Sequence, residues 1–532
     1  MSNLRFLGLI PTSLILVCLL SAFLGGLFMR ERPADSTQFL HTDRNLPGII
    51  SALAFLAANC GALEVVGMVA ASAKYGVLAL HFYWIGAIPA MIFLSLFMMP
   101  VYSRSRARTI PEFLKMRYGS RVQLLNALSQ IVMMVFVAGI SLYAISSMLE
   151  VFLGWKFIVT SVMVTILVIC YVSWGGLPTT IYSSLLLFIV TLLGLAPLSF
   201  LILARFHGLH GLSMSLPQSM QHAWRGLSWS NPQGSSMDVL GLTAGLGFVL
   251  GFGYWCTDFV LMQRAFAART SEAAMNTPLL AGLGKLAFSF FVVIPGLAAS
   301  VLFHGEIYNF DHALPRMMSR YYPSGLLELG IVAILASLIS ALSGNIAAFS
   351  TVWTHDIYRT YLVTDRKDHH YLRVGRGSAA IAACLAIGTG YFAFRYKNLM
   401  DYLQLVLALF SAPMFAILAL GMFTQWATAT GAFWGVICGM AFVLLHHLAC
   451  DFSLLSYGSQ MSADFYGAIY GFLATIAVTT GFSLVTETKS AAELEGVTFR
   501  WRDAPWRSVS PVSLVLAGFL LSLCLVLNLW LW

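Results

Sequence analysis

Fourteen apolar segments, each near the length that a lipid bilayer requires, divide this chain from one end to the other. They span about 6–29, 48–73, 79–101, 122–150, 156–174, 179–204, 237–262, 276–303, 325–355, 376–394, 399–423, 428–450, 463–485 and 509–531. A helix needs about 20 mostly apolar residues to cross the hydrocarbon core. The pattern predicts an all-α polytopic membrane protein with about 14 transmembrane helices.

The composition excludes a soluble chain and argues against a nucleic-acid partner. Of the 532 residues, 59% are hydrophobic and only 10% are charged, whereas soluble domains carry about 25% charged residues. The net charge of +8 comes from short loops between apolar segments, where basic residues determine topology. We therefore expect a lipid bilayer and a small-molecule solute as partners, and no organic cofactor.

The first apolar segment, 6–29, is too long for the core of a signal peptide and ends in Arg30-Glu31-Arg32 without a cleavage site of small residues. We predict that it is an extra N-terminal helix. No stretch of 100 residues remains for a separate soluble domain, so residues 1–532 are expected to form a single transmembrane domain.

The basic residues are distributed unequally between the two sides of the membrane. If the first loop is cytoplasmic, cytoplasmic loops hold 20 lysines and arginines and the opposite loops hold 8. The positive-inside rule then predicts an inner-membrane (plasma-membrane) protein with both termini outside the cytoplasm.

Two spans, five apart, carry signals of broken helices. The second contains Asn59-Cys60-Gly61 near its middle, and the seventh is rich in glycine between Gly241 and Gly253. Discontinuous helices at corresponding positions of two halves indicate a transporter site at the interface of two repeats. Small residues also allow close helix packing, so the pattern alone leaves both interpretations open.

Five motifs in order resemble the sodium/solute symporter family, and most closely its sodium/sugar branch. They are Ser36-Thr37-Gln38-Phe39-Leu40 with Arg44-Asn45-Leu46-Pro47 and Ala57-Ala58-Asn59; Thr109-Ile110-Pro111-Glu112-Phe113-Leu114 with Arg117-Tyr118; Tyr171 with Trp174-Gly175-Gly176-Leu177; Tyr254-Trp255 with Gln263-Arg264 and Ala267-Ala268; and Ser340 to Asp356-Ile357-Tyr358. The resemblance covers about residues 36–425.

This resemblance implies a LeuT-like architecture of five plus five helices in inverted repeats, with flanking helices. The first repeat would occupy 48–204, the second 237–423, and accessory helices 428–531. It implies a secondary active transporter, not an enzyme, that works by alternating access around a site near the membrane midplane. We expect a monomer.

The resemblance also implies a sodium site between the second and ninth spans, but this sequence departs from it. The ligands would be the carbonyls of Ala57, Cys60 and Ser337 and the hydroxyls at positions 340 and 341. Position 340 is Ser340, whereas Ala341 has no ligand oxygen, and Ser184 occupies the place of the family's usual aspartate. A hard cation weakens when an oxygen ligand is lost, so we expect sodium coupling to be weakened or absent. A serine in a span can instead bond a carbonyl of its own helix.

A solute site is implied by matches to the sugar branch. Asn59, Tyr254 and Lys285 match sugar contacts, and Gln404 lies near another. Glu64 stands where that branch has glutamine, Tyr83 replaces an acidic ligand, and Gly251 replaces an asparagine. Trp84 and Trp255 are candidates for stacking on the solute.

Glu64 and Lys285 are ionisable residues inside apolar segments. Such residues usually have a functional role and pair with another polar group. Glu64 either binds a cationic group of the solute, or is the proton-coupling carboxylate, or forms a structural ion pair with Lys285. The coupling ion is therefore Na⁺ or H⁺. Rival functions are a transporter-like sensor without net flux and a polytopic membrane enzyme.

Overall fold

The structure is a computed structural model that describes residues 46–61, 63–105, 107, 109–231, 233, 236–303, 309–396, 398–499 and 509–532. Within these ranges the chain is helical, apart from one isolated bridge between Leu46 and Ala268. In the described part of the chain, eleven helices are long and apolar enough to cross a membrane, or twelve if one bent pair counts as a span. The predicted all-α fold is confirmed, while the helix predicted at 6–29 lies outside the described residues.

The predicted break in the second span is present. Helix α3 (Gly48–Asn59) ends before the π-helix η1 (Leu63–Gly67), which continues into α4 (Met68–Tyr75) and the 3₁₀ turn η2 (Gly76–Leu80). At the break the Gly61 backbone N–H bonds the carbonyl of Asn59, two residues back, over 2.8 Å, so the α-helical hydrogen-bond pattern is interrupted.

The seventh span is broken as well. The π-helix η6 (Gly241–Leu250) runs into α11 (Gly251–Thr257), and α12 (Phe259–Phe266) then leaves at an angle of 54°. Asp258, between α11 and α12, is extended, and its side chain accepts a hydrogen bond of 2.8 Å from the Leu261 N–H. This N-cap satisfies one of the free donors that begin α12.

The remaining elements of the first half follow the predicted spans closely, with one difference. They are η3 (Phe82–Ala87), α5 (Ile88–Phe93), η4 (Leu94–Met98), α6 (Met99–Ser105), α7 (Ile110–Tyr118), α8 (Ser120–Leu153), α9 (Phe157–Arg205), α10 (Leu209–Ser215) and η5 (Gln218–Met220). Two spans were predicted within 156–204, but α9 is one continuous helix of 49 residues. It would measure about 74 Å if straight, more than twice the hydrocarbon core, so it includes both predicted spans and their connection.

The second half contains the longest buried helices and the flanking ones. They are α13 (Ser271–Leu302), η7 (Phe310–His312), α14 (Ala313–Tyr321), α15 (Ser324–Thr351), η8 (Val352–Leu362), α16 (Asp368–Phe392), η9 (Ala393–Arg395), α17 (Leu399–Phe423), α18 (Ala429–Asp451), α19 (Gln460–Val485) and α20 (Pro511–Trp530).

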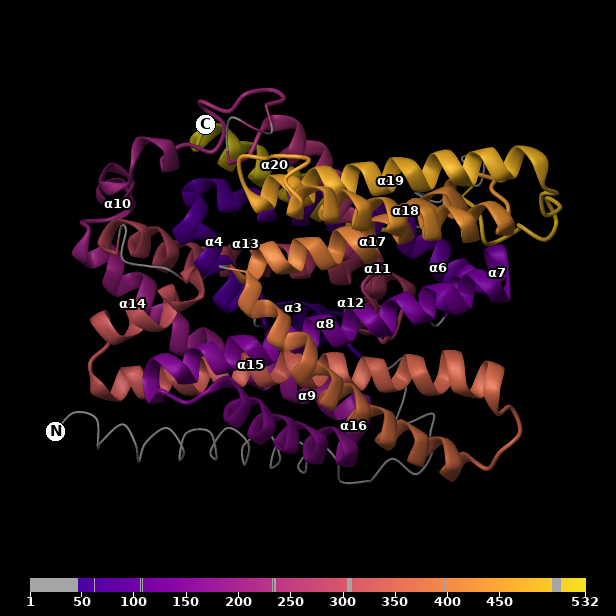
Figure 1. Ribbon diagram of the computed structural model, residues 1–532, viewed down its shortest axis with the longest axis horizontal. Helices are drawn as coiled ribbons and strands as arrows, with labels where there is room; N and C mark the ends of the chain where they lie inside the picture. The colour runs from indigo at the N-terminus through magenta and orange to yellow at the C-terminus, as the bar shows by residue number, and fades with distance from the viewer. Residues whose placement is uncertain are drawn as a thin grey trace.

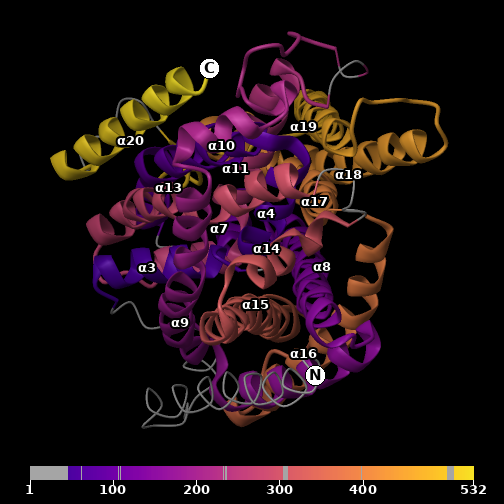
Figure 2. The same cartoon turned by 90° about the vertical axis from the view of Figure 1, so that its left-hand side faces the viewer.

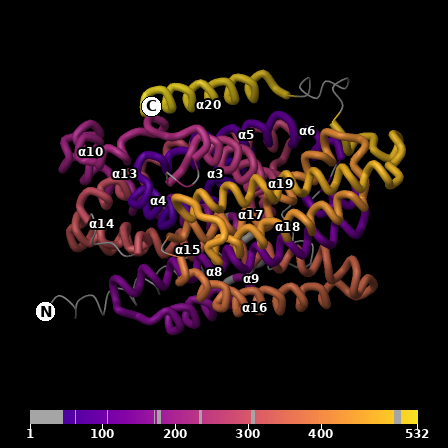
Figure 3. Tube along the Cα trace, turned by 45° about the horizontal axis from the view of Figure 1, so that its top comes forward, coloured from indigo at the N-terminus to yellow at the C-terminus, as the bar shows by residue number. Residues whose placement is uncertain are grey.

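The long helices run roughly side by side along the long axis of the molecule (Figure 1). Viewed nearly along that axis, α20 lies at the periphery and α18 and α19 form one flank, while α4, α13 and α17 lie inside (Figure 2). Figure 3 shows α20 along one edge of the bundle. In the most apolar windows of α18, α19 and α20 only 22–28% of residues are buried inside the protein, as expected of helices that face lipid.

Candidate functional site

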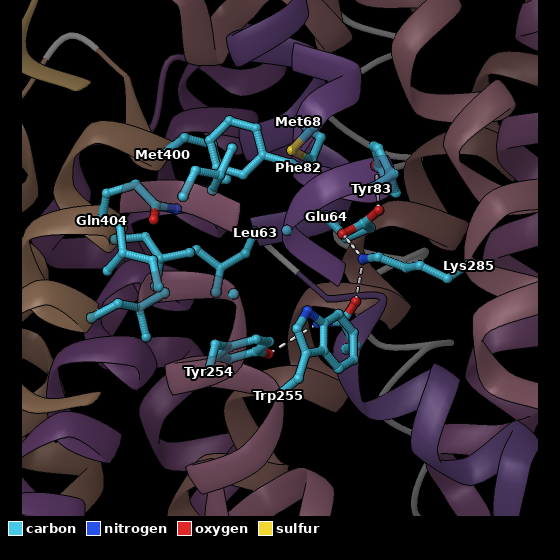
Figure 4. A pocket seen from close by; sticks show the side chains of 17 residues that line it. Leu63, Glu64, Met68, Phe82, Tyr83, Tyr254, Trp255, Lys285, Met400 and Gln404 are labelled. Carbon is cyan, nitrogen blue, oxygen red and sulfur yellow. Dashed lines mark hydrogen bonds and ion pairs between the residues drawn. The ribbon is translucent and has the colours of Figure 1, made fainter. Parts of the chain in front are cut away.

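An ion pair lies beside the break in the second span. Glu64 comes from η1 and Lys285 from the middle of α13, and both side chains are buried. The Lys285 ammonium contacts Glu64 Oε2 and also donates to Asn59 Oδ1. The Tyr83 hydroxyl donates to Glu64 Oε1, so both carboxylate oxygens of Glu64 are engaged (Figure 4).

Asn59 extends this network to the seventh span. Its amide Nδ2 donates to the Tyr254 hydroxyl over 2.9 Å. Beside it, Trp255 makes an edge contact with Tyr254 and stacks on Phe55. The Lys285 Nζ lies 5.5 Å from the centre of the Trp255 ring and 5.1 Å from that of Tyr83. The Asn59–Tyr254 hydrogen bond therefore joins the two broken spans directly, and Lys285 of α13 joins the same set through Asn59 and Glu64.

These residues line one cavity, between the two broken spans, α13 and α17. Apolar side chains make up much of its wall: Leu63, Met68, Phe82, Leu246, Leu250, Met400, Leu403 and Leu407. Gln404 also lines it, and its buried Oε1 has no hydrogen-bond partner among the described residues. An unpaired buried acceptor costs free energy, so this oxygen is available to a donor on a ligand.

Seven of the eight predicted solute residues line this cavity, and Trp84 does not. Trp84 is buried, and its ring meets the edge of His81. Residues 82–87 form a π-helix, whose wider turn changes which side chains share a face. Phe82, Tyr83 and Gly86 line the cavity from this segment. Their spacing places them on one helical face, and Trp84 lies on the opposite face.

Gly251 brings two backbones together at the cavity wall. A Cβ atom at this position would lie 2.2 Å from the carbonyl oxygen of Gly86. No side chain fits without a backbone shift, so α11 and η3 approach more closely here than any residue other than glycine allows. This contact reduces the space on that side of the cavity.

The residues of the predicted ion site meet at the same break. The Ser337 hydroxyl donates to the carbonyl oxygen of Cys60 over 2.6 Å. Ala341 faces Gly61, where an added Cβ would lie 2.3 Å from the Ala341 methyl group. Ala57 is buried in α3, one turn before the break.

Ser340 hydrogen-bonds elsewhere. Its hydroxyl donates to Ser184 Oγ over 2.8 Å, and Ser184 donates to the carbonyl of Thr180, in its own helix, over 2.5 Å. The predicted alternative for Ser340, a bond within its own helix, is thus not what forms: the partner is on α9. The hydroxyls of Ser337 and Ser340 are both occupied as donors, and position 341 adds no oxygen.

A second, smaller cavity adjoins the first one at Tyr254. It is lined by Gly61, Ala341, Asn345 and Asp258, and it shares Asn59, Leu63 and Tyr254 with the first cavity. The Asn345 amide donates to the Ala341 carbonyl over 2.9 Å. Sequence reasoning missed Asn345, although it lies one helical turn after Ala341 on the same face of α15.

Comparisons with known proteins agree with this geometry. The Sodium:solute symporter family profile matches residues 39–439. This chain belongs to the sodium:solute symporter family. It is 26% identical over 422 residues to a sodium/glucose cotransporter of Vibrio parahaemolyticus, covering 75% of this chain and 77% of the relative. It is 27% identical over 377 residues to a sodium/mannose cotransporter of Bos taurus, covering 64% of this chain and 62% of that protein.

Among solved structures, a Na⁺-coupled sialic acid symporter in a substrate-bound outward-open state aligns with a TM-score of 0.73 at 18% identity. The alignment covers 91% of this chain and 98% of that chain. The fold of the present chain is therefore LeuT-like. Family membership makes it a multi-pass secondary transporter rather than an enzyme, and supports Na⁺ as a coupling ion.

Proposed function

We propose that the symporter carries a small polar organic solute, such as a sugar or an amino sugar, through the cavity between its two broken spans. The observation that carries the proposal is the Glu64–Lys285–Asn59–Tyr254 network, because it ties both breaks to one cavity. Buried ionisable residues within spans are typical of transport pathways. Sugar cotransporters among its relatives favour the same solute class.

The repeat boundaries and the orientation belong to the same proposal. Residues 48–204 and 237–423 would form the two inverted repeats, with 428–531 as accessory helices, and alternating access would move one group against the other. The low burial of α18, α19 and α20 supports their place outside the repeats. Both termini would lie outside the cytoplasm, as the basic residues of the loops predict.

Sodium coupling is weakened in this symporter, or replaced by proton coupling. The support is local: Ala341 offers no oxygen at the break, and the Ser340 hydroxyl bonds Ser184, where the sequence has no acidic residue. Glu64 is the carboxylate positioned to take a proton, because it lies in the cavity wall beside the break. A proton on Glu64 would break its pair with Lys285 and free the ammonium for the solute.

The test is uptake into proteoliposomes in which sodium and proton gradients are imposed separately. We expect uptake to follow the proton gradient and to persist without sodium. Glu64→Gln, which keeps the shape but not the charge, should reduce proton-driven uptake at least tenfold and remove its pH dependence. Glu272→Gln, an exposed site at the start of α13, is the matched control and should behave as the unmodified protein.

Other outcomes would identify the alternatives. Uptake that collapses without sodium would overturn the weakened sodium coupling. Glu64→Gln that leaves both transport and its pH dependence intact would make the ion pair structural. If Glu64→Gln instead abolishes binding of amino sugars alone, Glu64 binds a cationic group on the solute. Solute binding without counterflow would indicate a sensor.

The solute itself can be found by thermal shift. A ligand that binds only the native state raises its apparent stability by mass action. Screening the purified symporter against sugars, amino sugars, amino acids and carboxylates, each with and without sodium, reports on solute and ion together.

A further inference from the structure

A second group of buried charges lies at the end of the bundle that carries η2, η7 and α14. At its centre the Lys74 ammonium donates to Asp401 Oδ2 over 2.5 Å, and the Tyr75 hydroxyl donates to Asp401 Oδ1 over 3.0 Å. Lys74 and Tyr75 end α4, and Asp401 lies in the first turn of α17. The pair therefore fastens the outer half of the first broken span to α17.

Two further buried carboxylates join this group. Asp311, in η7, accepts a hydrogen bond of 3.0 Å from the Leu399 N–H at the start of α17. Asp464, in α19, accepts one of 3.3 Å from the Gln460 amide. In each carboxylate the other oxygen, Oδ2, is buried and has no hydrogen-bond partner among the described residues.

The charges of this group do not balance. Among the residues that the structure describes, Asp311, Asp401 and Asp464 face a single ammonium, that of Lys74. If all were ionised, two negative charges would remain without a partner in a buried site. Such burial is costly, and a carboxylate in this situation binds a proton instead.

Asp311 shows this effect directly, because it lies outside the membrane-spanning helices. Burial raises its pKa to about 7; the Leu399 N–H opposes the rise, and the Asp401 carboxylate adds to it. Tyr143 of α8 and Lys74 of α4 also face Asp311 and lower its pKa. His312 follows Asp311 in η7, and its own charged neighbours are Glu150 of α8 and Arg316 of α14.

The position of this group connects it to the cavity. Met400 directly precedes Asp401 and lines the cavity together with Met68 of α4. Figure 4 shows Met68, Phe82 and Met400 at the side of the cavity away from Tyr254 and Trp255. A Cβ at Gly67 would lie 3.1 Å from Met400, so the two segments are in contact. A path from the cavity to this end requires α4 and α17 to separate, which parts Lys74 from Asp401.

We propose that Asp311, Asp401 and Asp464 form a proton-binding site, separate from Glu64, that latches this end of the cavity shut. The closed arrangement binds the proton because the carboxylates are buried together. The open arrangement hydrates them and releases it. Acidification on this side, which the loop charges predict to be outside the cytoplasm, therefore favours the closed form.

The sign and size follow from linkage. A hydrated aspartate has a pKa of about 4, and that of Asp311 in the closed form is about 7. Between these values only the closed form holds the proton, so its advantage grows as pH falls from about 7 towards 4 and is lost as pH rises through 7. Between pH 7.5 and 5.5 the closed-to-open ratio should rise on the order of tenfold.

Hydrogen–deuterium exchange of the symporter in lipid nanodiscs tests the latch, with labelling times corrected for the intrinsic effect of pH. We expect peptides from 63–80 and 399–410 to be protected about tenfold more at pH 5.5 than at pH 7.5, because exchange reports local opening. Asp311→Asn keeps the acceptor for Leu399 but stays neutral, so it should show the acidic level of protection at both pH values.

Controls make the result specific. Asp451→Asn removes an exposed carboxylate, the last residue of α18, and should retain the full pH effect. Glu64→Gln should retain it too, which separates the latch from proton coupling in the cavity. Should Asp311→Asn fail to fold, Asp464→Asn provides the second variant, with a reduced pH effect expected. An unmodified protein without a pH effect, or one whose effect survives both aspartate substitutions, would overturn the proposal.

Discussion

Two lysines in this symporter contact buried carboxylates, and their surroundings differ. At the cavity, Lys285 and Glu64 balance each other, and Asn59 and Tyr83 take up the remaining hydrogen bonds. At the end of the bundle, Lys74 pairs with Asp401 while two further aspartates lie close by. The Lys285 side chain is 4% exposed and that of Lys74 is 23% exposed.

The two groups differ in how readily they can bind or release protons. A balanced, fully bonded pair holds a fixed geometry, and it changes only when a ligand or a proton breaks a specific bond. An unbalanced group with a partly exposed cation can take up or lose protons without losing its central pair. The first arrangement suits recognition of a solute, and the second suits a response to pH.

The largest effect should come from breaking the balanced pair. Lys285→Met leaves Glu64 as a buried charge without its cation, and removal of one partner of a buried pair costs about 3–5 kcal/mol. We expect a large fall in the thermal unfolding temperature of the purified protein and loss of transport.

The double variant Lys285→Met/Glu64→Gln removes both charges and should recover most of this stability while transport stays lost. If the double variant were as unstable as the single one, the cost would come from lost packing around the Lys285 chain rather than from an unpaired charge.

Removing the cation of the second group, formed by Lys74, Asp311, Asp401 and Asp464, should cost less stability. The size of this cost should depend on pH. Lys74→Met removes a partly exposed cation, whose pairing is weakened by solvent. At pH 8 Asp311 is ionised, since its pKa is about 7, and we expect a cost of about 1–2 kcal/mol. At pH 5.5 Asp311 carries its proton and repels its neighbours less, so the cost should fall below about 1 kcal/mol.

Thermal unfolding at the two pH values measures this difference. Lys285→Met measured alongside should cost more than Lys74→Met at both pH values, because its ion pair is the more deeply buried of the two. Equal costs for Lys74→Met at both pH values would break the contrast between the two groups.

The smallest change in stability should come from Ala341→Ser, which restores a hydroxyl at the break facing Gly61. We expect unfolding free energy to change by less than about 1 kcal/mol, while the thermal shift produced by sodium increases, corresponding to about tenfold tighter binding. Ala347→Ser, another buried alanine of α15, is the control. A sodium response that stays the same would show that the missing oxygen is not what limits the ion site.

Much of the fold could be predicted from the sequence, because a segment that crosses the lipid bilayer must be apolar and about 20 residues long. The apolar segment at 399–423 coincides with α17, and both predicted breaks occur where Asn59-Cys60-Gly61 and the glycine-rich segment indicated them. Bilayer thickness fixes segment length, and glycine with short polar residues interrupts helical bonding. These effects are local, and a single sequence reveals them.

The remainder depends on contacts between distant segments or on small changes of helical register. The connection expected between the two spans of α9 is helical, and nothing in the sequence pattern distinguishes such a connection from a loop. Trp84 does not line the cavity, because Phe82, Tyr83 and Gly86 form the face of η3 that does, and which face meets the cavity depends on the neighbouring helices. The group formed by Lys74, Asp311, Asp401 and Asp464 was not predicted. These residues come from four separate elements and lie near span ends, where charged residues are common.

The contact between Gly251 and Gly86 limits how this protein can acquire a different cargo. An asparagine at position 251, which the resemblance to sugar carriers implies there, would drive its side chain into the Gly86 carbonyl. A side chain at position 251 therefore requires an adjustment of the η3 backbone, so a single replacement there should be poorly tolerated. Directed changes of specificity should start instead from Gln404 and Leu403 of α17, whose side chains line the cavity.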